Sequence, residues 1–436
     1  MAFPTLFTIL FFLIFIPTIF SRTLQSPLSS TTLLSSPISF STHVHHRRRQ
    51  RYINTQPSNT LSTFSSSKVI SDTYATNEHL LVIPVGIGRN STSSPMLKTE
   101  LIIDTGSSLT WVQAIPCDSC YEQGAFSYYN HFASESYEAI NCKDDTCRDV
   151  PRASHNECLD LPWDSKEPCS YHTEYGDGTT SSGVIGTETF YFQDPYVGFG
   201  HEPVRFVPFG LGTSNYIPRW IKTSTPGIAG LMRGPGNLID RLNVKKFSHC
   251  FPREEDATGI LSFGEEAKIM GAKIALLNNS RYYMARLTNV YMAGKWIPME
   301  NDVLPTKMMF DTGFTHSFLD PNIMDAVVEA IKGALGRYQP RKVKGFELCY
   351  DLTQLYSVSL DEVAKITFEF NYTTDIHVFS FHLWERQSEN QLICLSLHRG
   401  APKENIFGNN LMREVNIGYT LEEDDLAMYF HRQHCK

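Results

Sequence analysis

The pattern of hydrophobic and polar positions changes twice along this 436-residue chain. Residues 2–20 form one nearly continuous apolar run, whereas residues 22–76 are rich in Ser, Thr and Pro and have no lasting hydrophobic period. From about residue 78 onward, short apolar runs alternate with Gly, Pro, Asn and Asp, as is typical of many antiparallel strands. The pattern predicts a mainly β protein, and the length predicts two lobes because one compact core rarely holds so many residues.

Individual elements can be placed from this pattern. Only two segments indicate helices, residues 237–242 and, more clearly, residues 321–333. The clearest strand runs are residues 79–87, 99–104, 188–193, 204–211, 259–264, 282–294, 365–372 and 415–421. We therefore expect four parts: a signal peptide at 1–21, a prosegment or linker at 22–76, an N-terminal lobe at 77–245 and a C-terminal lobe at 246–436.

The N-terminal apolar run predicts export. It is followed by the small residue Ser21, which suits signal-peptide cleavage. A retained membrane anchor is the alternative, since the run is long and no basic residue precedes it. Pro17 and the polar segment beyond favour cleavage, and no other stretch is long and apolar enough to span a bilayer. We expect no membrane association after cleavage.

Charge separates the leader from the body of the protein. The formal net charge is −8, but residues 1–76 carry a net +5, including the basic run HHRRRQR at 45–51, so the remainder carries −13. An acidic body argues against nucleic acid or an anionic membrane as partner, and it suits work at low pH. The basic run is interpreted as part of a prosegment that docks in an acidic cleft; a solvated flexible leader and a partner-binding site are the alternatives.

Ten cysteines fit an oxidising compartment, where cysteines pair. The even count permits full pairing, but spacing alone leaves the connectivity open. Cys117-x-x-Cys120 suggests zinc only weakly, because no second ligand pair follows at metal spacing, and we expect no metal. Asn90, Asn278 and Asn371 begin sequons for N-glycosylation. The cysteines are Cys117, Cys120, Cys142, Cys147, Cys158, Cys169, Cys250, Cys349, Cys394 and Cys435.

One long-range duplication carries the candidate chemistry. The segment LIIDTGSS at 101–108 recurs as MMFDTGFT at 308–315, which places Asp104 and Asp311 in equivalent positions, each after an apolar strand. Glycine lets the backbone turn tightly beside each carboxylate. Two carboxylates a few ångströms apart cannot both ionise, so they share a proton; the ionised member activates water and the protonated member polarises a carbonyl. This chemistry needs no cofactor.

From about residue 78 to its end, the chain resembles the pepsin-like aspartic proteases, specifically the nepenthesin-like branch of plants. The segment 104–113 (DTGSSLTWVQ) matches the first active-site motif of this family, and 170–178 (SYHTEYGDG) matches its flap hairpin. Residues 227–231 (GIAGL) and 405–409 (NIFGN) resemble the strands that support the two active loops. Further marks typical of the branch are 247–250, 346–350 and the six cysteines of 117–169.

The resemblance implies a bilobal pepsin-like fold with a cleft between two β lobes. It implies a secreted endopeptidase of protein or peptide substrates, monomeric, active in acid and inhibited by pepstatin, located in the apoplast or the vacuole. Tyr175 would close over the substrate with Trp111 behind it. The remaining site residues it implies are Thr105, Gly106, Ser107, Thr312 and Gly313, and the disulfides it implies are Cys349–Cys394 and, less firmly, Cys250–Cys435.

The sequence departs from the family pattern beside the second aspartate. Relatives carry Ser or Thr where this chain has Phe314, so Asp311 lacks a hydroxyl donor that Ser107 supplies to Asp104. Because a hydrogen bond contributes roughly 0.5–1.5 kcal/mol, we expect the acid optimum to shift upward, unless a backbone amide or water replaces the hydroxyl. His316 either adds a titrating group or is a satisfied histidine at the strand end. Ala114, where relatives have Cys, indicates a lost or rewired disulfide.

A second function class stays open. Some plant proteins of the pepsin fold are inactive and act as protein-binding inhibitors or defence proteins, and they typically lose one aspartate or its loop. This chain keeps Asp104, Asp311, both threonines, Tyr175 and Trp111. The sequence therefore favours the protease, and Phe314 is the main feature that favours the alternative.

Overall fold

The computed structural model describes residues 40–44 and 74–75 by their backbone only. With side chains it describes 80–90, 95–150, 153, 158, 161–162, 164–193, 198–199, 203–218, 223–253, 257–299, 303–387 and 391–435. The predicted signal peptide and the basic run at 45–51 lie outside the described residues, as does most of the segment 22–76.

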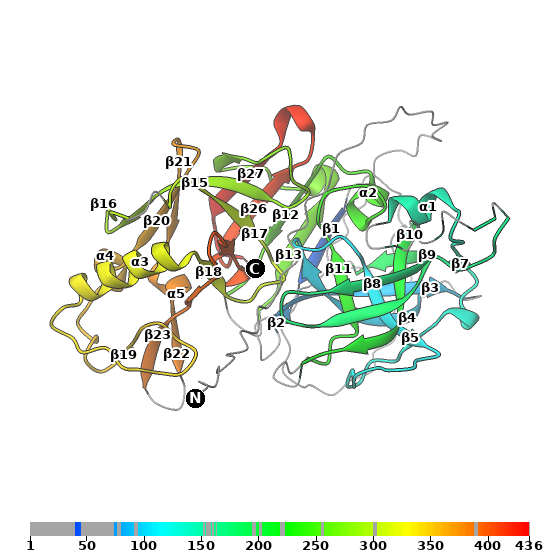
Figure 1. Ribbon diagram of the computed structural model, residues 1–436, viewed down its shortest axis with the longest axis horizontal. Coiled ribbons are helices and arrows are strands. Elements are labelled where there is room, and N and C mark those ends of the chain that lie inside the picture. The colour runs from blue at the N-terminus through cyan, green and yellow to red at the C-terminus, as the bar shows by residue number, and fades with distance from the viewer. Residues whose placement is uncertain are drawn as a thin grey trace, which may run out of the picture. The chain divides into compact units, whose positions relative to one another are not determined.

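Strands dominate the described chain and form four sheets (Figure 1). The largest has ten strands and forms what we call the N-terminal lobe, at the right in Figure 1. Its main path runs β2 (Tyr74–Ala75), β3 (Leu81–Arg89), β4 (Pro95–Asp104), β11 (Gly227–Gly230), β5 (Trp111–Ile115), β10 (Val204–Tyr216), β9 (Thr180–Phe192) and β7 (Glu138–Ala139), with β6 (Tyr129–Asn130) paired to β5 and β8 (Ser170–Glu174) paired to β9.

The C-terminal lobe, at the left in Figure 1, contains two sheets. The eight-stranded sheet orders β21 (Thr374–Val378), β20 (Ile366–Phe370), β15 (Met284–Met292), β17 (Thr306–Phe310), β25 (Ile406–Phe407), β18 (Ser317–Leu319) and β24 (Leu397–Arg399), with β16 (Lys295–Trp296) paired to β15. The three-stranded sheet consists of β19 (Cys349–Asp351), β23 (Leu392–Leu395) and β22 (Trp384–Gln387).

A six-stranded sheet lies between the lobes (Figure 1). Its order is β1 (Phe40–Val44), β13 (Gly259–Phe263), β12 (Lys246–Cys250), β26 (Val415–Thr420), β27 (Ala427–Arg432) and β14 (Ala272–Ala275). The edge strand β1 pairs antiparallel with β13, Phe40 opposite Phe263. This strand falls within the segment interpreted as prosegment or linker, so that segment contributes to a sheet. The domain boundaries themselves stay predictions.

Helices are few and short. The two that the sequence indicates are α2 (Leu238–Leu242) and α3 (Pro321–Ala334), and both are confirmed. Asp320 caps α3 by accepting a hydrogen bond from the Asn322 amide, and Pro321 occupies the first turn, where its missing N–H costs nothing. The others are α1 (Asp145–Asp149), α4 (Leu360–Val363) and α5 (Ser380–Leu383), with 3-10 turns at His131–Ala133, Gly264–Glu266, Asn409–Leu411 (η4) and Glu423–Asp425. Among the described helices, none is long and apolar enough to cross a membrane.

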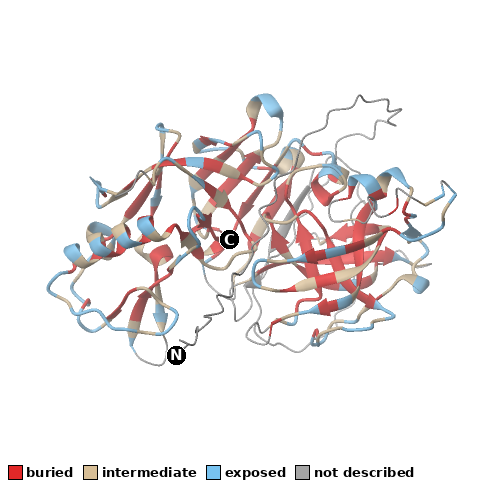
Figure 2. Cartoon of the chain, in the orientation of Figure 1, coloured by how far each residue is buried: buried red, intermediate tan, exposed pale blue. Residues whose placement is uncertain are grey.

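The core follows the strands, and the buried residues of Figure 2 lie along the sheets of both lobes. In β4 burial alternates for most of its length, as expected of a strand with one covered face. In β3 the first eight of nine residues are buried, so both faces of this strand are covered, and β4 and β9 pair with it. The eight predicted strand runs are confirmed: each overlaps one of β3, β4, β9, β10, β13, β15, β20 and β26.

The N-terminal lobe also buries a carboxylate that the sequence analysis missed. Glu188, in the middle of β9, is fully buried. It accepts hydrogen bonds from the Tyr129 hydroxyl (2.5 Å), the Ser134 hydroxyl (2.6 Å) and the Thr189 amide (2.6 Å), and also from the Ser136 hydroxyl. Several donors satisfy the buried carboxyl oxygens, which explains how a strand in the core accommodates a glutamate.

All ten cysteines form disulfides. Cys349 pairs with Cys394 across β19 and β23, and Cys250 pairs with Cys435, as the family resemblance implies. The six cysteines before the flap pair among themselves as Cys117–Cys120, Cys142–Cys158 and Cys147–Cys169. The Cys117-x-x-Cys120 pair is therefore a disulfide rather than a zinc ligand pair.

Candidate active site

Two supporting strands fix the backbone of the two aspartate loops. β4 ends at Asp104, and β11 runs parallel beside it with Gly230 opposite Asp104. In the C-terminal lobe, β17 ends at Phe310 and β25 runs parallel with Phe407 opposite. The Asp311 amide donates to the Phe407 carbonyl (3.0 Å), and the Asp104 carbonyl accepts from the Leu231 amide (2.7 Å). The segments 227–231 and 405–409 thus hold the two loops in equivalent ways.

Reciprocal threonine hydrogen bonds join the loops. The Thr105 amide donates to Thr312 Oγ1 and the Thr312 amide donates to Thr105 Oγ1, both at 3.0 Å. Each hydroxyl then donates to a backbone carbonyl of the opposite loop, Thr105 to Phe310 (3.2 Å) and Thr312 to Ile103 (2.8 Å). Both threonines are fully buried, so water does not compete for these bonds. The two aspartates are consequently held at a fixed separation.

Glycines make room for the carboxyl groups. The Gly106 amide donates to Asp104 Oδ1 and the Gly313 amide to Asp311 Oδ1, each at 2.8 Å. A Cβ atom on Gly106 would lie 1.9 Å from Asp311 Oδ2, and one on Gly313 would lie 2.5 Å from Asp104 Oδ1. Each carboxyl therefore packs against the glycine of the opposite loop, and any side chain at either glycine would collide with it.

Burial shifts the pKa of both carboxyls. Only 5% of Asp104 and 3% of Asp311 is exposed. Burial raises the pKa of Asp104, although hydrogen bonds from Ser107 and from the protonated Asp311 oppose this. Burial, together with repulsion by the neighbouring Asp104 charge, raises the pKa of Asp311 well above its usual range. Because the two buried carboxyls cannot both ionise comfortably, the pair shares one proton.

The position after each Asp-Thr-Gly differs between the loops. The Ser107 hydroxyl donates to Asp104 Oδ2. Phe314 occupies the corresponding place in the second loop and has no donor to offer. Burial and the Asp104 charge already account for the raised pKa of Asp311, so this direction does not test the effect of the missing hydroxyl. The shift of the acid optimum stays a prediction.

Strands β8 and β9 form the hairpin that matches the flap motif. Two backbone hydrogen bonds close the turn of this hairpin. The Gly178 amide donates to the Tyr175 carbonyl (2.9 Å), and the Tyr175 amide donates to the Thr179 carbonyl (2.9 Å). The Tyr175 hydroxyl accepts from Trp111 Nε1 at 2.7 Å. Burial and the nearby Asp104 raise the pKa of the Tyr175 phenol, which therefore stays neutral. The structure thus brings Tyr175, Trp111 and Ser107 to the Asp104 side of the pair.

The sequence analysis missed the anchor of the second loop. The Asn409 side-chain amide donates to the Thr312 carbonyl (3.2 Å), and its backbone amide donates to the Phe314 carbonyl (2.8 Å). Asn409 is the last residue of segment 405–409, which the sequence already indicates as a support of the active loops. The role of Asn409 itself could not be predicted, because it depends on a contact between distant parts of the chain. His316 lies outside this anchor, with its ring 4.5 Å from that of His398.

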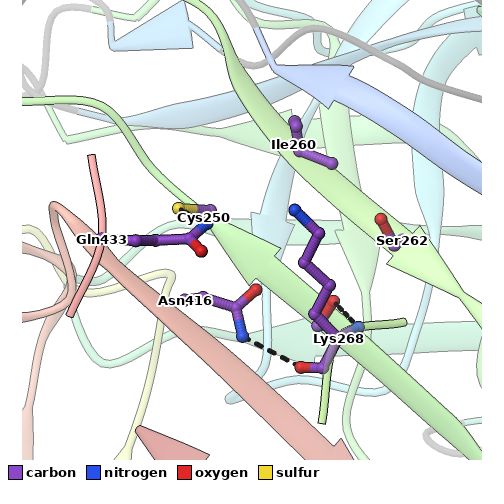
Figure 3. Close-up of a pocket in the computed structure, with 7 residues that line it drawn as sticks. Cys250, Ile260, Ser262, Lys268, Asn416 and Gln433 are labelled. Atoms are coloured by element: carbon purple, nitrogen blue, oxygen red, sulfur yellow. Dashed lines mark hydrogen bonds between the residues drawn. The ribbon is translucent and has the colours of Figure 1, made fainter. Parts of the chain in front are cut away.

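Two further features lie outside the contacts of the carboxyl pair: Ala114 and one hollow. Ala114 is fully buried in β5, and all ten cysteines pair with one another, so no cysteine is left without its partner by this alanine. The hollow in Figure 3 lies on the six-stranded sheet and has a volume of about 10 Å³, far below the roughly 300–1,000 Å³ of typical ligand pockets. It is lined by Ser248, Cys250, Ile260, Ser262, Lys268, Asn416 and Gln433. Neither aspartate borders it, so we do not assign it a part in the chemistry.

Sequence comparison adds family evidence to this geometry. Residues 87–265 match the family described as "Xylanase inhibitor N-terminal", and residues 282–430 match "Xylanase inhibitor C-terminal". Aspartyl protease UND of Arabidopsis thaliana is 27% identical over 350 residues, which cover 78% of this chain and 83% of that protein. Aspartic proteinase nepenthesin-2 of Nepenthes gracilis is 25% identical over 387 residues, covering 85% and 81%.

Solved structures show the same fold. Basic 7S globulin from soybean superimposes with a TM-score of 0.64 at 16% identity, covering 84% of this chain and 96% of that one. Conglutin gamma from lupine seeds gives 0.63 at 14% identity, covering 84% and 95%. At such identities the likeness concerns the fold alone, and it agrees with the predicted mainly β, bilobal architecture.

Proposed function

Because this chain belongs to the pepsin-like aspartic protease family of plants, we propose that it is a secreted aspartic endopeptidase active in acid, with Asp104 and Asp311 as its catalytic pair. The observation that carries the proposal is the juxtaposition of the two buried carboxyls, each packed against the glycine of the other's loop. Two fixed carboxyls that share one proton place a general base and a general acid side by side, which is the arrangement that this hydrolysis needs.

The proposed reaction uses the difference between the two carboxyls. Ionised Asp104 takes a proton from a water molecule as its oxygen attacks the scissile carbonyl carbon. Asp311 donates its proton to the carbonyl oxygen, which gives a neutral tetrahedral intermediate. Asp104 then protonates the leaving amine as the C–N bond breaks, and Asp311 recovers its proton from the intermediate. The pair returns to its starting state with one water consumed.

The flap supports a binding role for the residues around the pair. Tyr175, held by Trp111, would cover a peptide lying across the carboxyls, and Ser107 would keep Asp104 ionised. Thr105, Thr312, Gly106 and Gly313 would set the geometry rather than react. The substrates would be proteins or peptides, which the enzyme would bind as a monomer.

Secretion belongs to the same proposal. The signal peptide would be removed in transit and the segment 22–76 on activation, with the apoplast as destination or, alternatively, the vacuole. Two of the three sequon asparagines differ in how accessible their side chains are to glycosylation. Asn278 is exposed, whereas Asn371 is half-buried and its side-chain amide donates to the Ala275 carbonyl at 3.0 Å. Asn278 is therefore the better glycan acceptor of these two.

A second candidate function is a non-catalytic, protein-binding inhibitor or defence protein. The description of the matching family names xylanase inhibitors, and Phe314 departs from the protease pattern beside Asp311. Both aspartates and both threonines are nevertheless in place and hydrogen-bonded. This intact constellation favours the protease.

Cleavage of acid-denatured haemoglobin by the purified full chain between pH 3 and 7 tests the proposal. Asp104→Asn should abolish cleavage, and the exposed Asp118→Asn should leave it unchanged as a matched control. Sequencing the N-terminus of the active form tests removal of the leader. Inactivity of the wild type at every pH, even with residues 1–76 removed, together with xylanase inhibition, would replace the protease by the inhibitor.

A further inference from the structure

The second aspartate loop touches the turn of the flap through Phe314. A Cβ atom on Gly176, at the flap turn, would lie 3.3 Å from Cζ of Phe314. The Phe314 ring is half-buried and makes an edge-to-face contact with the Phe318 ring, with centroids 5.7 Å apart and planes at 80°. A residue of the C-terminal lobe therefore reaches the hairpin of the N-terminal lobe on the side of the pair where Asp311 lies.

The backbone that carries this ring is anchored. The Phe314 carbonyl accepts from the Asn409 amide (2.8 Å), and the Thr315 carbonyl accepts from the Asn410 amide (3.1 Å). Two residues later, the Ser317 hydroxyl accepts from the Gly408 amide (2.9 Å). Because the loop cannot retreat without breaking these bonds, only rotation of the ring or lifting of the flap would separate Phe314 from Gly176.

The flap is held from its other side as well. The hydrogen bond from Trp111 Nε1 to the Tyr175 hydroxyl fastens the residue next to Gly176 to the N-terminal lobe. A peptide crossing the two carboxyls would have to pass between the flap turn and the second loop, where the ring now lies. A bulky side chain at that point must displace the ring, whereas a small one needs less room.

We propose that Phe314 is a specificity-determining residue that closes this passage and restricts the enzyme to peptides with a small side chain, Gly, Ala or Ser, at the position that faces the second loop. The inference rests on the proposed protease function and deepens it. Steric exclusion of a few methylene groups discriminates roughly 10–200-fold in kcat/KM. We expect discrimination of that size between Ala and Leu at the affected position.

The test is a peptide-library cleavage profile of the full chain after activation, in wild type and in Phe314→Val and Phe314→Thr. Both variants remove the ring, and they differ only in a hydroxyl. At one substrate position, both should raise kcat/KM for Leu, Phe and Met about tenfold or more and leave Gly and Ala little changed. The exposed Phe132→Val, in the N-terminal lobe, is the matched control and should leave the profile unchanged.

A second variant tests the contact from the flap side. Gly176 lies outside the left-handed backbone region, so Gly176→Ala is tolerated locally but adds a methyl group against the ring. It should lower kcat/KM severalfold in the wild-type background and much less when combined with Phe314→Val. Equal losses in both backgrounds would show that the two residues act independently and would overturn the inference.

Binding of pepstatin, measured by calorimetry, separates failure of the inference from failure of the proposed function. Phe314→Val should bind pepstatin, which has bulky apolar side chains, at least about tenfold more tightly than the wild type. If the wild type cleaves peptides but its profile and pepstatin affinity match those of Phe314→Val, Phe314 does not close the passage, although the protease assignment stands. If Phe314→Val instead loses cleavage of peptides with aromatic side chains, the Phe314 ring binds such side chains rather than excluding them, and the inference is overturned. If no variant cleaves peptides or binds pepstatin, the protease assignment fails and the inference fails with it.

Discussion

The hydroxyl of Ser107 donates a hydrogen bond to Oδ2 of Asp104. The equivalent position of the second loop holds a phenyl ring, so the internal repeat of the two loops is broken beside the carboxyls. The bond favours the charged form of Asp104, and no equivalent side-chain donor favours the charged form of Asp311. One side-chain difference thus gives two aspartates with alike backbone settings different hydrogen-bond partners.

Removing the Ser107 hydroxyl should shift the acid limb of the pH–rate profile. Ser107→Ala takes away a donor that lowers the pKa of Asp104, so this carboxyl should ionise at higher pH. A hydrogen bond contributing about 0.5–1.5 kcal/mol corresponds to a loss of roughly twofold to tenfold in kcat/KM at the acid end. The measurement is kcat/KM from pH 2.5 to 7, with the exposed Ser357→Ala as control. An acid limb that stays in place would contradict the role given to Ser107.

Giving the second loop a hydroxyl should move the other limb. In Phe314→Thr a donor can stabilise ionised Asp311, so its pKa should fall and the alkaline limb should move to lower pH. Phe314→Val removes the ring without adding a donor and should leave that limb where the wild type has it. The same pH–rate measurement on both variants separates the effect of the donor from that of the ring. Coincident alkaline limbs in the two variants would rule out the missing hydroxyl as the cause of a raised optimum.

The buried pair should make the protein less stable as pH rises. The folded protein raises the pKa of Asp311 above its value in the unfolded chain. The free energy of unfolding is therefore highest below the unfolded-state pKa, where Asp311 is protonated in both states, and it falls as pH rises to the folded-state pKa. The asparagine of Asp311→Asn cannot ionise. This variant should therefore raise the Tm at pH 7, by about 2 °C for each kcal/mol of repulsion removed, and change it little at pH 3. The Tm should be measured by calorimetry from pH 3 to 7.

Asp320 provides a control of opposite sign. Its burial alone would raise its pKa, but hydrogen bonds from the Lys403 and Asn322 amides outweigh burial and lower it. This contribution to stability is present above the pKa of the unfolded chain and is lost as pH falls. Asp320→Asn should therefore lower the Tm at pH 7 more than at pH 3. If both asparagine variants respond to pH in the same direction, the protonation assigned to the pair is wrong.

The disulfides should contribute unequally. Cys349–Cys394 closes a loop with a sequence separation of 45, whereas Cys117–Cys120 spans only 3. On the chain-entropy estimate, replacing the first pair by serines should cost about 4 kcal/mol and replacing the second about 1.5 kcal/mol. Urea unfolding of the two double variants measures the difference. Similar losses in both would show that loop length does not govern their contribution here.

The central part of the site could be predicted because its signals are local. In each Asp-Thr-Gly segment an apolar strand, an acid and a turn glycine are adjacent in sequence, and duplication of the segment announces a pair. Helix α3 was predicted from an equally local pattern, whereas Tyr175 was predicted only because segment 170–178 resembles the flap of the family.

Other features depend on contacts that sequence spacing does not encode. Phe314 meets Gly176 across 138 positions, and Asn409 reaches Thr312 across 97. The sequence around Glu188 does not predict which hydroxyl groups donate hydrogen bonds to its carboxyl group. The pairing of the six cysteines before the flap was open for the same reason, because loop closure permits several connectivities of similar cost.

The reciprocal threonine bonds also bear on how the molecule can move. Thr105 and Thr312 tie the two loops together at the carboxyls, while the six-stranded sheet joins the lobes beside them. Any rocking of one lobe against the other must turn about the places that remain tied. The two carboxyl groups then lie near the axis of such a rotation, which displaces them least, whereas the flap and the outer loops lie further from the axis and move most. Such a rotation would change the room beneath the flap while the spacing of the two carboxyls stays fixed.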